Sequence, residues 1–242
     1  RLVAVASRDM GRAKDFATRH NAEAGYDSMA AMLRHPGLDA VAVASPNALH
    51  KDHTVMAAEA GVHVLCEKPM ALTLGDCEIM IEACARKKVK LGVGFHLRYH
   101  PGHREAKRLI SAGVLGAVVL AQAQWGGGVR GLTQAPPRTG LGAWRNDPDL
   151  AGAGAMCDRG VHVIDLLRFL TGREAAEVMA FTDGQTKARP LEDLVTALLR
   201  FQDGTFGMLM TSRNTPDPLN DFAIHGSGGR VGGRGTIGVN LG

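Results

Sequence analysis

Residues 39–66 read DAVAVASPNALHKDHTVMAAEAGVHVLC, and this stretch decides the fold. The apolar runs 39–44 and 62–66 have the length and composition of buried strands, and residues 50–60 between them form a helix that ends at Gly61. Strands that are apolar throughout and alternate with helices are typical of a parallel sheet covered on both faces.

The same alternation extends in both directions along the chain. Residues 2–6 predict a strand, residues 10–20 a helix capped by Asp9, and residues 28–34 a short helix. A helix over 73–87 and a strand over 89–95 complete the pattern, so we expect a partial Rossmann-like, doubly wound parallel sheet in a domain over residues 1–95. Because the chain starts at Arg1 and directly enters a strand, we expect it to be a fragment.

After residue 95 the pattern changes. A helix over 101–111 and a strand over 117–125 lead into a long Gly/Pro-rich stretch, 126–154, and then to a helix over 159–170. Four strand-like runs follow, at 177–182, 194–202, 205–212 and 221–225, with a hairpin turn at Asp203-Gly204. We expect residues 96–242 to form an α+β domain with an open, mostly antiparallel sheet, incomplete at its C-terminus.

Composition excludes several classes of protein. The 242 residues are 45% hydrophobic and 21% charged, which is typical of a globular chain rather than a disordered one. The formal net charge of +4 is spread along the chain without a basic run, which argues against nucleic acid as a partner. The chain has no apolar stretch of about 18 residues and no leader, so we expect a cytoplasmic protein that does not bind membranes. The four cysteines predict buried thiols rather than disulfides or a zinc site.

Ligands of doubly wound sheets bind beyond the carboxyl ends of the strands, so the residues that follow each strand are the first candidates. Ser7-Arg8 follow the first strand. A hydroxyl and a guanidinium suit the 2′-phosphate of NADP, whereas NAD sites place a carboxylate at this position. The sequence therefore favours NADP over NAD; the alternative is a surface pair that opens the next helix.

Ser45-Pro46-Asn47 follow the next strand, with His50 close behind. These residues either contact the cofactor or only start the following helix. His50 and His53 lie one helical turn apart, but no carboxylate or thiolate joins them at a convincing spacing, so we predict no metal site.

Glu67-Lys68-Pro69 end the third strand. Proline holds Lys68 extended, and the strand directs its amine toward the crevice, which makes Lys68 a candidate acid/base or carbonyl-polarising group. The alternative is a surface salt pair between Glu67 and Lys68.

Asp158 and His162 are four residues apart, a spacing at which side chains share one face of a helix. They can act as a pair in which His162 carries a proton and Asp158 orients it, with Asp165 as a supporting residue. The small residues 152–155 beside them would allow a ligand close to the backbone. The alternative is a purely structural Asp and His.

Two further clusters are candidates for substrate contacts. His96, Arg98, His100 and His103 lie between the two halves, where we favour crevice lining over metal binding because no acid or cysteine completes a site. Trp144-Arg145 near the end of the long loop could bind a polyhydroxylated or anionic substrate, or could anchor the loop.

Together these motifs resemble the Gfo/Idh/MocA family of oxidoreductases. The resemblance covers nearly the whole chain and rests on Ser7-Arg8, residues 45–50, Glu67-Lys68-Pro69, residues 94–101 and residues 152–165. It implies an N-terminal dinucleotide-binding domain and a C-terminal α/β domain whose open sheet commonly forms subunit contacts. Residues 144–148 resemble the sugar-acting members, particularly the 1,5-anhydro-D-fructose reductases.

The resemblance also implies roles for individual residues. Lys68 would contact substrate and nicotinamide, Asp158 would be the supporting carboxylate, and His162 the proton donor or acceptor. The chief departure is the family's first strand with its G-x-G-x-x-G loop, which we expect upstream of Arg1. Arg159 stands where an apolar residue is common, and Ala153 where Gly often is.

We therefore predict an NAD(P)-dependent oxidoreductase that transfers hydride between nicotinamide and a carbonyl or secondary alcohol of a sugar, polyol or related compound. The expected catalytic residues are Lys68, Asp158 and His162. NADP, with NAD possible, would contact Ser7, Arg8, Ser45, Pro46, Asn47, His50, Glu67 and Lys68. The substrate would contact Lys68, His96, Trp144, Arg145, Asp158 and His162.

The expected assembly is a homodimer or homotetramer, because an uncovered sheet face in the second half needs burial. Two alternative functions stay open on the sequence. One is a non-catalytic nucleotide-sensing regulator on the same fold, and the other is a family member that uses transient oxidation for elimination or hydrolysis.

Overall fold

The computed structural model describes residues 1–184, 186, 187 and 190–238. The chain divides into two compact units, Arg1–Gly94 and Phe95–Gly242, each with its own hydrophobic core. Within the described residues, every helix is too short or too polar to cross a bilayer.

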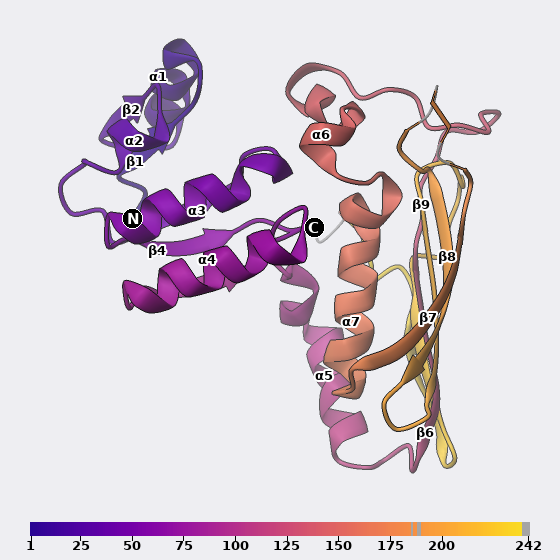
Figure 1. The fold of residues 1–242 in the computed structure, drawn as a ribbon. Helices are drawn as coiled ribbons and strands as arrows, with labels where there is room; N and C mark the ends of the chain where they lie inside the picture. The colour runs from indigo at the N-terminus through magenta and orange to yellow at the C-terminus, as the bar shows by residue number, and fades with distance from the viewer. Residues whose placement is uncertain (185, 188–189, 239–242) are drawn as a thin grey trace. The chain divides into compact units, whose positions relative to one another are not determined.

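The first unit alternates strands with helices, as the sequence predicts (Figure 1). Its strands are β1 (Ala4–Ala6), β2 (Ala24–Tyr26), β3 (Ala40–Val43), β4 (His63–Cys66) and β5 (Leu91–Val93). Its helices are α1 (Met10–Arg19), α2 (Met29–Met32), α3 (His50–Glu59) and α4 (Leu74–Arg86). β1 pairs in parallel with β2, and β3, β4 and β5 pair in parallel in that order.

Side-chain caps explain where two of these helices begin. The Asp9 carboxylate accepts a hydrogen bond from the backbone N–H of Arg12 at 2.8 Å, which confirms the predicted cap of α1. The Thr73 hydroxyl accepts from the N–H of Asp76 at 3.1 Å and starts α4.

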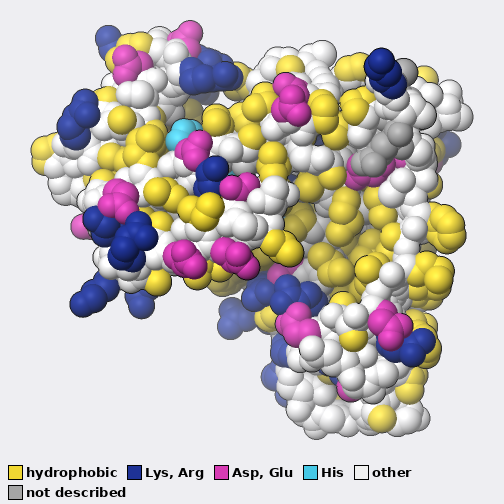
Figure 2. All heavy atoms as spheres, viewed as in Figure 1, with side chains coloured by type: hydrophobic (Ala, Val, Ile, Leu, Met, Phe, Trp, Pro, Cys, Tyr) yellow, Lys and Arg dark blue, Asp and Glu magenta, His cyan; other side chains and the backbone are white. Residues whose placement is uncertain are grey.

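Acidic and basic side chains are mixed over the surface of α3 and α4 (Figure 2). Glu59 forms ion pairs with Arg86 and Lys87 on these helices.

The sequence did not predict β2, because Ala24-Gly25-Tyr26 is short and has no β-branched residue. Gly25 is needed there for packing. A Cβ atom on it would lie 2.7 Å from the backbone of Ala13 in α1, so only a glycine lets the strand lie against the helix.

The helices cover one face of the β3–β5 sheet. Val43, Val64 and Cys66 point into a core with Ala57 of α3 and Met80 of α4. The alternate residues, such as Ala42 and Leu65, are exposed in this structure. Burial therefore alternates along these described strands, although their runs are apolar throughout.

The second unit packs helices against one face of a single sheet (Figure 1). Its strands are β6 (Val118–Trp125), β7 (Ala175–Thr182), β8 (Leu194–Phe201), β9 (Phe206–Ser212), β10 (Phe222–Gly226) and β11 (Gly229–Gly233). Its α-helices are α5 (Pro101–Ser111), α6 (Pro148–Ala151) and α7 (Val161–Thr171). Two 3₁₀ segments, His96–Tyr99 and Gly140–Asn146, and a π-helical turn, Met156–Gly160, complete the unit.

The strand order is β11-β10-β6-β9-β8-β7. All neighbours are antiparallel except β6 and β9, which run parallel, so the sheet is mostly antiparallel as predicted. The predicted hairpin at Asp203-Gly204 is present, and Gly204 adopts a φ of 87° that favours glycine. The sequence missed β11 because three of its five residues are glycine.

The Gly/Pro-rich stretch 126–154, in which the sequence indicates no element, contains the 3₁₀ segment Gly140–Asn146 and helix α6. The predicted helix over 159–170 is also different. It is α7 from Val161 onward, and the preceding residues Met156–Gly160 form the π-helical turn. The expectation that the second domain is incomplete at its C-terminus stays a prediction, and residues 239–242 lie outside the described residues.

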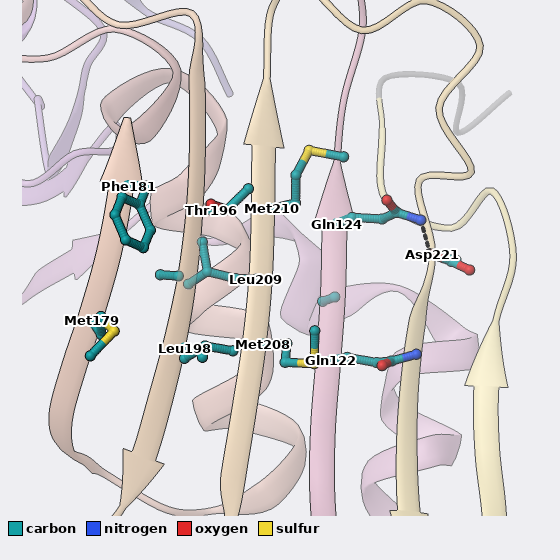
Figure 3. Close-up of a pocket in the computed structure, with 12 residues that line it drawn as sticks. Gln122, Gln124, Met179, Phe181, Thr196, Leu198, Met208, Leu209, Met210 and Asp221 are labelled. Atoms are coloured by element: carbon teal, nitrogen blue, oxygen red, sulfur yellow. Dashed lines mark hydrogen bonds between the residues drawn. The ribbon is translucent and has the colours of Figure 1, made fainter. Parts of the chain in front are cut away.

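The two faces of the second sheet differ in cover. α7 packs through Leu166, Leu167 and Leu170 onto one face, where Ala121 and Phe201 are buried. The opposite face, which we call the outer face, carries large apolar side chains (Figure 3), most of which are exposed in the described chain. These outer-face side chains are Met179, Phe181, Leu198, Phe206, Met208 and Met210.

Candidate active site

The residues after β1 lie at the N-terminus of α1. Arg8 is exposed, and the Ser7 hydroxyl accepts a hydrogen bond from the N–H of Asp9 at 3.3 Å. The nearest carboxylate, that of Asp9, is bonded to the first turn of its own helix. A hydroxyl and a guanidinium next to a helix N-terminus form a donor set that fits a phosphate monoester.

His50 holds two strand-end segments together. It is 1% exposed, and its Nδ1 lies 2.8 Å from the carbonyl oxygen of Pro69 while its Nε2 lies 2.9 Å from that of Ser45. The Ser45 hydroxyl in turn is hydrogen-bonded to Nδ1 of His53 at 3.0 Å. The observed contacts of His50 therefore position the loops after β3 and β4.

Asn47 is not the cap residue of α3, because the N-cap of α3 is Leu49, and Pro46 is the N-cap of the 3₁₀ turn Asn47–Leu49 that precedes it. The Asn47 side chain is buried at the carboxyl end of β3. The start of the helix is therefore explained by Pro46, which fixes the turn, and the prediction that Asn47 contacts the cofactor stays open to test.

Glu67 and Lys68 follow β4 directly. The backbone N–H of Glu67 donates to the carbonyl oxygen of Val43 at 2.9 Å, so β4 stays in register with β3 up to this residue. The Glu67 carboxylate accepts from the N–H of Lys68 at 3.2 Å and lies against Gly94, where a Cβ atom would be 3.4 Å from it. Lys68 is half-buried, and its peptide bond with Pro69 is cis.

The thiol that precedes this motif has a structural role. Cys66 is fully buried and donates to the carbonyl oxygen of Glu67 at 3.3 Å. Burial raises the pKa of Cys66 to about 11, so the thiol stays protonated at neutral pH and is a poor nucleophile. All four cysteines are free, and Cys84 is buried as well.

His162 lies near the start of α7 in an aromatic surround. Its ring centroid is 4.7 Å from that of His96, 5.1 Å from that of Trp125 and 6.2 Å from that of Phe95. The imidazole is 3% exposed. These aromatic rings restrict the orientation of the His162 imidazole. Among the residues predicted to contact the substrate, His96 lies next to His162.

An ion pair one turn further along α7 fixes this arrangement. Arg98 donates from Nε and Nη2 to the two oxygens of Asp165, at 2.9 and 2.6 Å. The Asp165 carboxylate is buried, and hydrogen bonding to it raises the pKa of Arg98. Because Arg98 and His96 share the 3₁₀ segment His96–Tyr99, the pair ties His96 to the helix that carries His162.

The segment that carries Asp158 is not α-helical. Asp158 lies in the π-helical turn Met156–Gly160, which is wider than an α-helical turn, so the four-residue spacing to His162 does not have its usual geometry. Its carboxylate accepts from Nη2 of Arg138 at 2.5 Å, and Nε of Arg145 and of Arg159 lie 4.0 and 3.9 Å from it. Pairing of Asp158 with His162 stays a prediction.

The small residues 152–155 serve a packing role in this structure. A Cβ atom on Gly154 would lie 1.9 Å from the carbonyl oxygen of Glu192, which leaves no room for any side chain. The buried Glu192 carboxylate accepts from the N–H groups of Gly154 and Met156, at 2.9 and 2.8 Å. The backbone here is thus close to the Glu192 segment rather than left open for a ligand.

The long Gly/Pro-rich stretch 126–154 contacts the π-helical turn Met156–Gly160 through Arg138 and Arg145. Arg145 stacks over Trp144 with its guanidinium carbon 4.3 Å from the ring centroid, and Trp144 is only half-buried. Asn146 donates to the carbonyl oxygen of Arg138 at 2.7 Å and accepts from its N–H at 2.9 Å, which positions Arg138 toward Asp158. No sequence signal identified Arg138, because it lies in a stretch without readable periodicity.

His100 and His103, which follow His96 along the chain, form structural hydrogen bonds. His103 is fully buried between the carbonyl oxygen of Leu97 and the hydroxyl of Thr236, and His100 caps α5 by accepting from the N–H of Gly102. Within the described part of the chain, no group of three His, Cys, Asp or Glu side chains is placed to hold a metal ion.

The predicted site residues thus fall into two sets. Ser7, Arg8, Ser45, Asn47 and Lys68 lie beyond the carboxyl ends of β1, β3 and β4 in the first unit, and Pro46, His50 and Glu67 belong with them. His96, Trp144, Arg145, Asp158 and His162 belong to the second unit. Convergence of Lys68 and His162 on one substrate carbon stays a prediction.

Comparison with known proteins covers both units. A model of an oxidoreductase family with an NAD-binding Rossmann fold matches residues 1–95, and a model of the GFO/IDH/MocA C-terminal domain matches residues 103–232. Among curated relatives, 1,5-anhydro-D-fructose reductase of Ensifer adhaerens is 32% identical over 98% of this chain and 69% of its own length. D-xylose 1-dehydrogenase (NADP(+)) 2 of Haloferax volcanii is 32% identical over 89% of this chain and 62% of its own.

Solved structures that are similar to this chain also belong to sugar oxidoreductases. Aldose-aldose oxidoreductase of Caulobacter crescentus, complexed with glycerol, has a TM-score of 0.88 at 29% identity and is matched over 98% of this chain and 70% of its own. A levoglucosan dehydrogenase complexed with NADH and levoglucosan has a TM-score of 0.87 at 29% identity, over 96% and 64%. The chain therefore spans about two thirds of the length of these proteins, and it belongs to the Gfo/Idh/MocA oxidoreductase family.

Proposed function

We propose that the protein is an NAD(P)-dependent oxidoreductase that transfers hydride between nicotinamide and a carbonyl or secondary alcohol carbon of a sugar or polyol. The observation that carries this proposal is His162. Its imidazole is buried among His96, Trp125 and Phe95 and is held on a helix that the Arg98–Asp165 pair fixes. A restrained, desolvated imidazole is suited to move one proton at a defined atom.

The chain's residues supply the proton chemistry and the positioning. In the direction of reduction His162 protonates the forming alkoxide, and the Lys68 ammonium stabilises its negative charge; in oxidation the two roles reverse. Asp158 supports the proton transfer from the preceding turn. When bound, the nicotinamide ring donates or accepts the hydride.

NADP is the cofactor that we propose, with NAD as the second choice. The exposed Arg8 guanidinium and the Ser7 hydroxyl fit a 2′-phosphate, and the Asp9 carboxylate is engaged with its own helix. Ser45, Asn47 and Glu67 lie beyond the neighbouring strands of the same unit and would contact the rest of the cofactor.

We also propose that two copies of the protein associate through the outer face. Phe181 is 73% exposed there and Met179 64%, although both are large and apolar. Glu177 and Arg200 form an ion pair within the same sheet, which leaves the face without a net charge from these two residues. A face of this kind is stabilised when it is buried against a second copy in a dimer or a tetramer.

The catalytic proposal is tested with His162→Ala and Lys68→Met in the full-length protein, with His20→Ala and Lys90→Met as exposed controls. Each catalytic change is expected to lower kcat by about a hundredfold or more, with the controls unchanged. If both residues act on one carbon, the double variant loses less than the product of the single losses. Near wild-type turnover in both single variants would contradict the assignment.

The same assays separate the alternatives. Cofactor binding without turnover on a broad panel of neutral and acidic sugars would indicate a nucleotide-sensing regulator. Tightly retained cofactor with product formation but no net absorbance change of nicotinamide would indicate transient oxidation in the service of elimination or hydrolysis. A cytoplasmic location stays a prediction.

A further inference from the structure

Three backbone N–H groups at the start of the helical segment that carries Asp158 donate to one buried residue, Glu192. The Glu192 carboxylate accepts from the N–H of Gly154 at 2.9 Å and from that of Met156 at 2.8 Å, and its carbonyl oxygen accepts from the N–H of Ala155 at 2.9 Å. Glu192 is 2% exposed and lies 36 to 38 residues further along the chain. One residue therefore satisfies three consecutive donors of a distant segment.

Glu192 takes the part of a helix cap. The first N–H groups of a helix have no acceptor within the helix, and a Ser, Thr, Asn or Asp side chain at the N-cap usually supplies one. Here the N-cap of the π-helical turn is Ala155, whose methyl group cannot accept a hydrogen bond. A carboxylate at this end also faces the positive end of the helix dipole. The start of the segment is thus fixed by a side chain from the sheet rather than by its own sequence.

Two backbone hydrogen bonds extend this anchor into the π-helical turn. The carbonyl oxygen of Gly154 accepts from the N–H of Asp158 at 3.0 Å. The carbonyl oxygen of Met156 accepts from the N–H of Val161, the residue before His162. The carboxylate that holds Gly154 and Met156 therefore sets where the wide turn begins, and with it the register of Asp158 relative to His162.

The sheet makes Glu192 a fixed support. The residues that follow it enter β8, and at this end of the sheet the N–H of Arg213 donates to the carbonyl oxygen of Asp193 at 2.7 Å. Thr211 of β9 is fully buried and donates from its hydroxyl to the carbonyl oxygen of Ala155 at 3.2 Å. Side chains held by packing and hydrogen bonds to a rigid element keep a neighbouring site in its productive geometry.

We infer that Glu192 is a positioning residue for the proposed reaction, which holds the π-helical turn so that the Asp158 carboxylate keeps its place relative to the His162 imidazole. The inference rests on the proposed function, in which Asp158 supports the proton transfer by His162. Glu192 acts through the backbone of the turn, so its loss should slow the chemical step rather than weaken binding.

Glu192→Gln is the mildest change that tests this role. Glutamine has the same shape, but its NH₂ group replaces one of the two oxygens that accept from the turn. The full-length protein is assayed with NADP and with the sugar of the panel described above that wild type turns over fastest. We expect kcat to fall about tenfold or more, with the KM values for sugar and NADP within about twofold of wild type.

Thr205→Val is the matched control. Thr205 is also buried in the second unit, and its hydroxyl donates to the carbonyl oxygen of Val118 at 3.1 Å, away from the π-helical turn. Loss of this hydrogen bond should lower Tm and leave kcat unchanged. A role of Glu192 in stability alone would give the same result for both variants, whereas a positioning role separates kcat from Tm.

The Asp158→Asn background shows whether Glu192 acts through Asp158. If it does, Glu192→Gln should lower kcat less than about threefold once Asp158→Asn is present, because the positioned carboxylate is already gone. An equal loss in both backgrounds, or an unchanged kcat for Glu192→Gln alone, would overturn the inference and leave the activity standing. Wild-type kcat in both Asp158→Asn and His162→Ala would overturn the proposed site and the inference with it.

Amide hydrogen exchange gives a readout that does not depend on turnover or on recovery of the variant. In wild type the N–H groups of Gly154, Ala155 and Met156 should exchange as slowly as those of β8, and Glu192→Gln should speed their exchange about tenfold or more while Thr205→Val does not. Fast exchange of these three groups in wild type would overturn the inference. A wild type without turnover on the whole panel would overturn the proposed activity and, with it, this catalytic role.

Discussion

Arg98 and Asp165 form a two-pronged ion pair that joins the 3₁₀ segment His96–Tyr99 to α7, with hydrogen bonds of 2.9 and 2.6 Å. The acidic partner is 3% exposed, and the Arg98 side chain is 43% exposed and lies over the rings of Phe95 and Phe169. The pair thus fixes both the position of His96 and the packing around His162.

Arg98→Met should leave the Asp165 carboxylate buried without this partner. Because a buried charge that loses its hydrogen bonds is costly, we expect a loss of about 2 kcal/mol in the free energy of unfolding, or roughly 4–8 °C in Tm. Arg108→Met is the matched control, since Arg108 bonds Glu105 with the same forked geometry at an exposed site and should cost less than about 1 kcal/mol. Equal losses in the two variants, measured by thermal unfolding, would contradict this account.

Ser7→Asp should shift cofactor preference from NADP toward NAD. A carboxylate after β1 would repel a 2′-phosphate and accept hydrogen bonds from a 2′-hydroxyl. We expect kcat/KM for NADP to fall about tenfold or more relative to that for NAD in the full-length protein. Arg12→Gln on α1 serves as an exposed control of charge. An unchanged ratio would show that the residues after β1 do not contact the cofactor's ribose.

Phe181→Glu should dissociate the proposed assembly. A carboxylate on the outer face would have to be buried without a partner when two copies associate, which is strongly unfavourable. We expect light scattering after size-exclusion chromatography to give a dimer or tetramer for wild type and a smaller species for the variant. Phe16→Glu, at a phenylalanine on α1 that is 40% exposed, should keep the wild-type mass. A monomeric wild type would rule out the assembly.

His53 should make the protein less stable on acidification. Burial lowers the pKa of His53 in the folded chain, partly offset by the charge of Asp52 and reinforced by that of His50. Below pH 6.5 the unfolded chain therefore binds a proton that the folded chain does not, and the free energy of unfolding falls as the pH falls.

His53→Gln removes this proton linkage. Urea unfolding between pH 5 and 7.5 should show a shallower pH dependence for the variant, by up to about 1.4 kcal/mol per pH unit. His103, whose pKa is also lowered by burial, contributes equally to both proteins and leaves a residual slope. Parallel curves for the two proteins would exclude His53 as a source of the pH dependence.

Much of the fold could be predicted because its strands and helices are locally encoded. The runs that became β3, β4 and β8 are apolar and β-branched, and α5 occupies the residues predicted for it. β2 and β11 could not be predicted, since glycine carries no strand signal, and a Cβ atom on Gly25 or Gly232 would lie 2.7 Å from the backbone of a neighbouring element.

The candidate site was predictable only in part. Lys68, Asp158 and His162 stand in recognisable motifs, whereas Arg138 and Arg98 gain their importance from partners 20 and 67 residues away. The dyad was derived from α-helical spacing, and the π-helical turn between Asp158 and His162 changes that geometry. Long-range ion pairs and turn type depend on tertiary packing, which residue spacing does not encode.

The π-helical turn adds a consequence for engineering the enzyme. Each residue of an α-helix rotates the side-chain direction by about 100°, so deletion of one residue within Met156–Gly160 would rotate the adjoining residues of that turn, Asp158 among them, relative to α7. Asp158 would then leave the reach of Arg138, while His162 and the Arg98–Asp165 pair stayed in place. One codon would thus test whether Asp158 supports proton transfer, because the carboxylate would be displaced while the imidazole of His162 and its aromatic neighbours were unchanged.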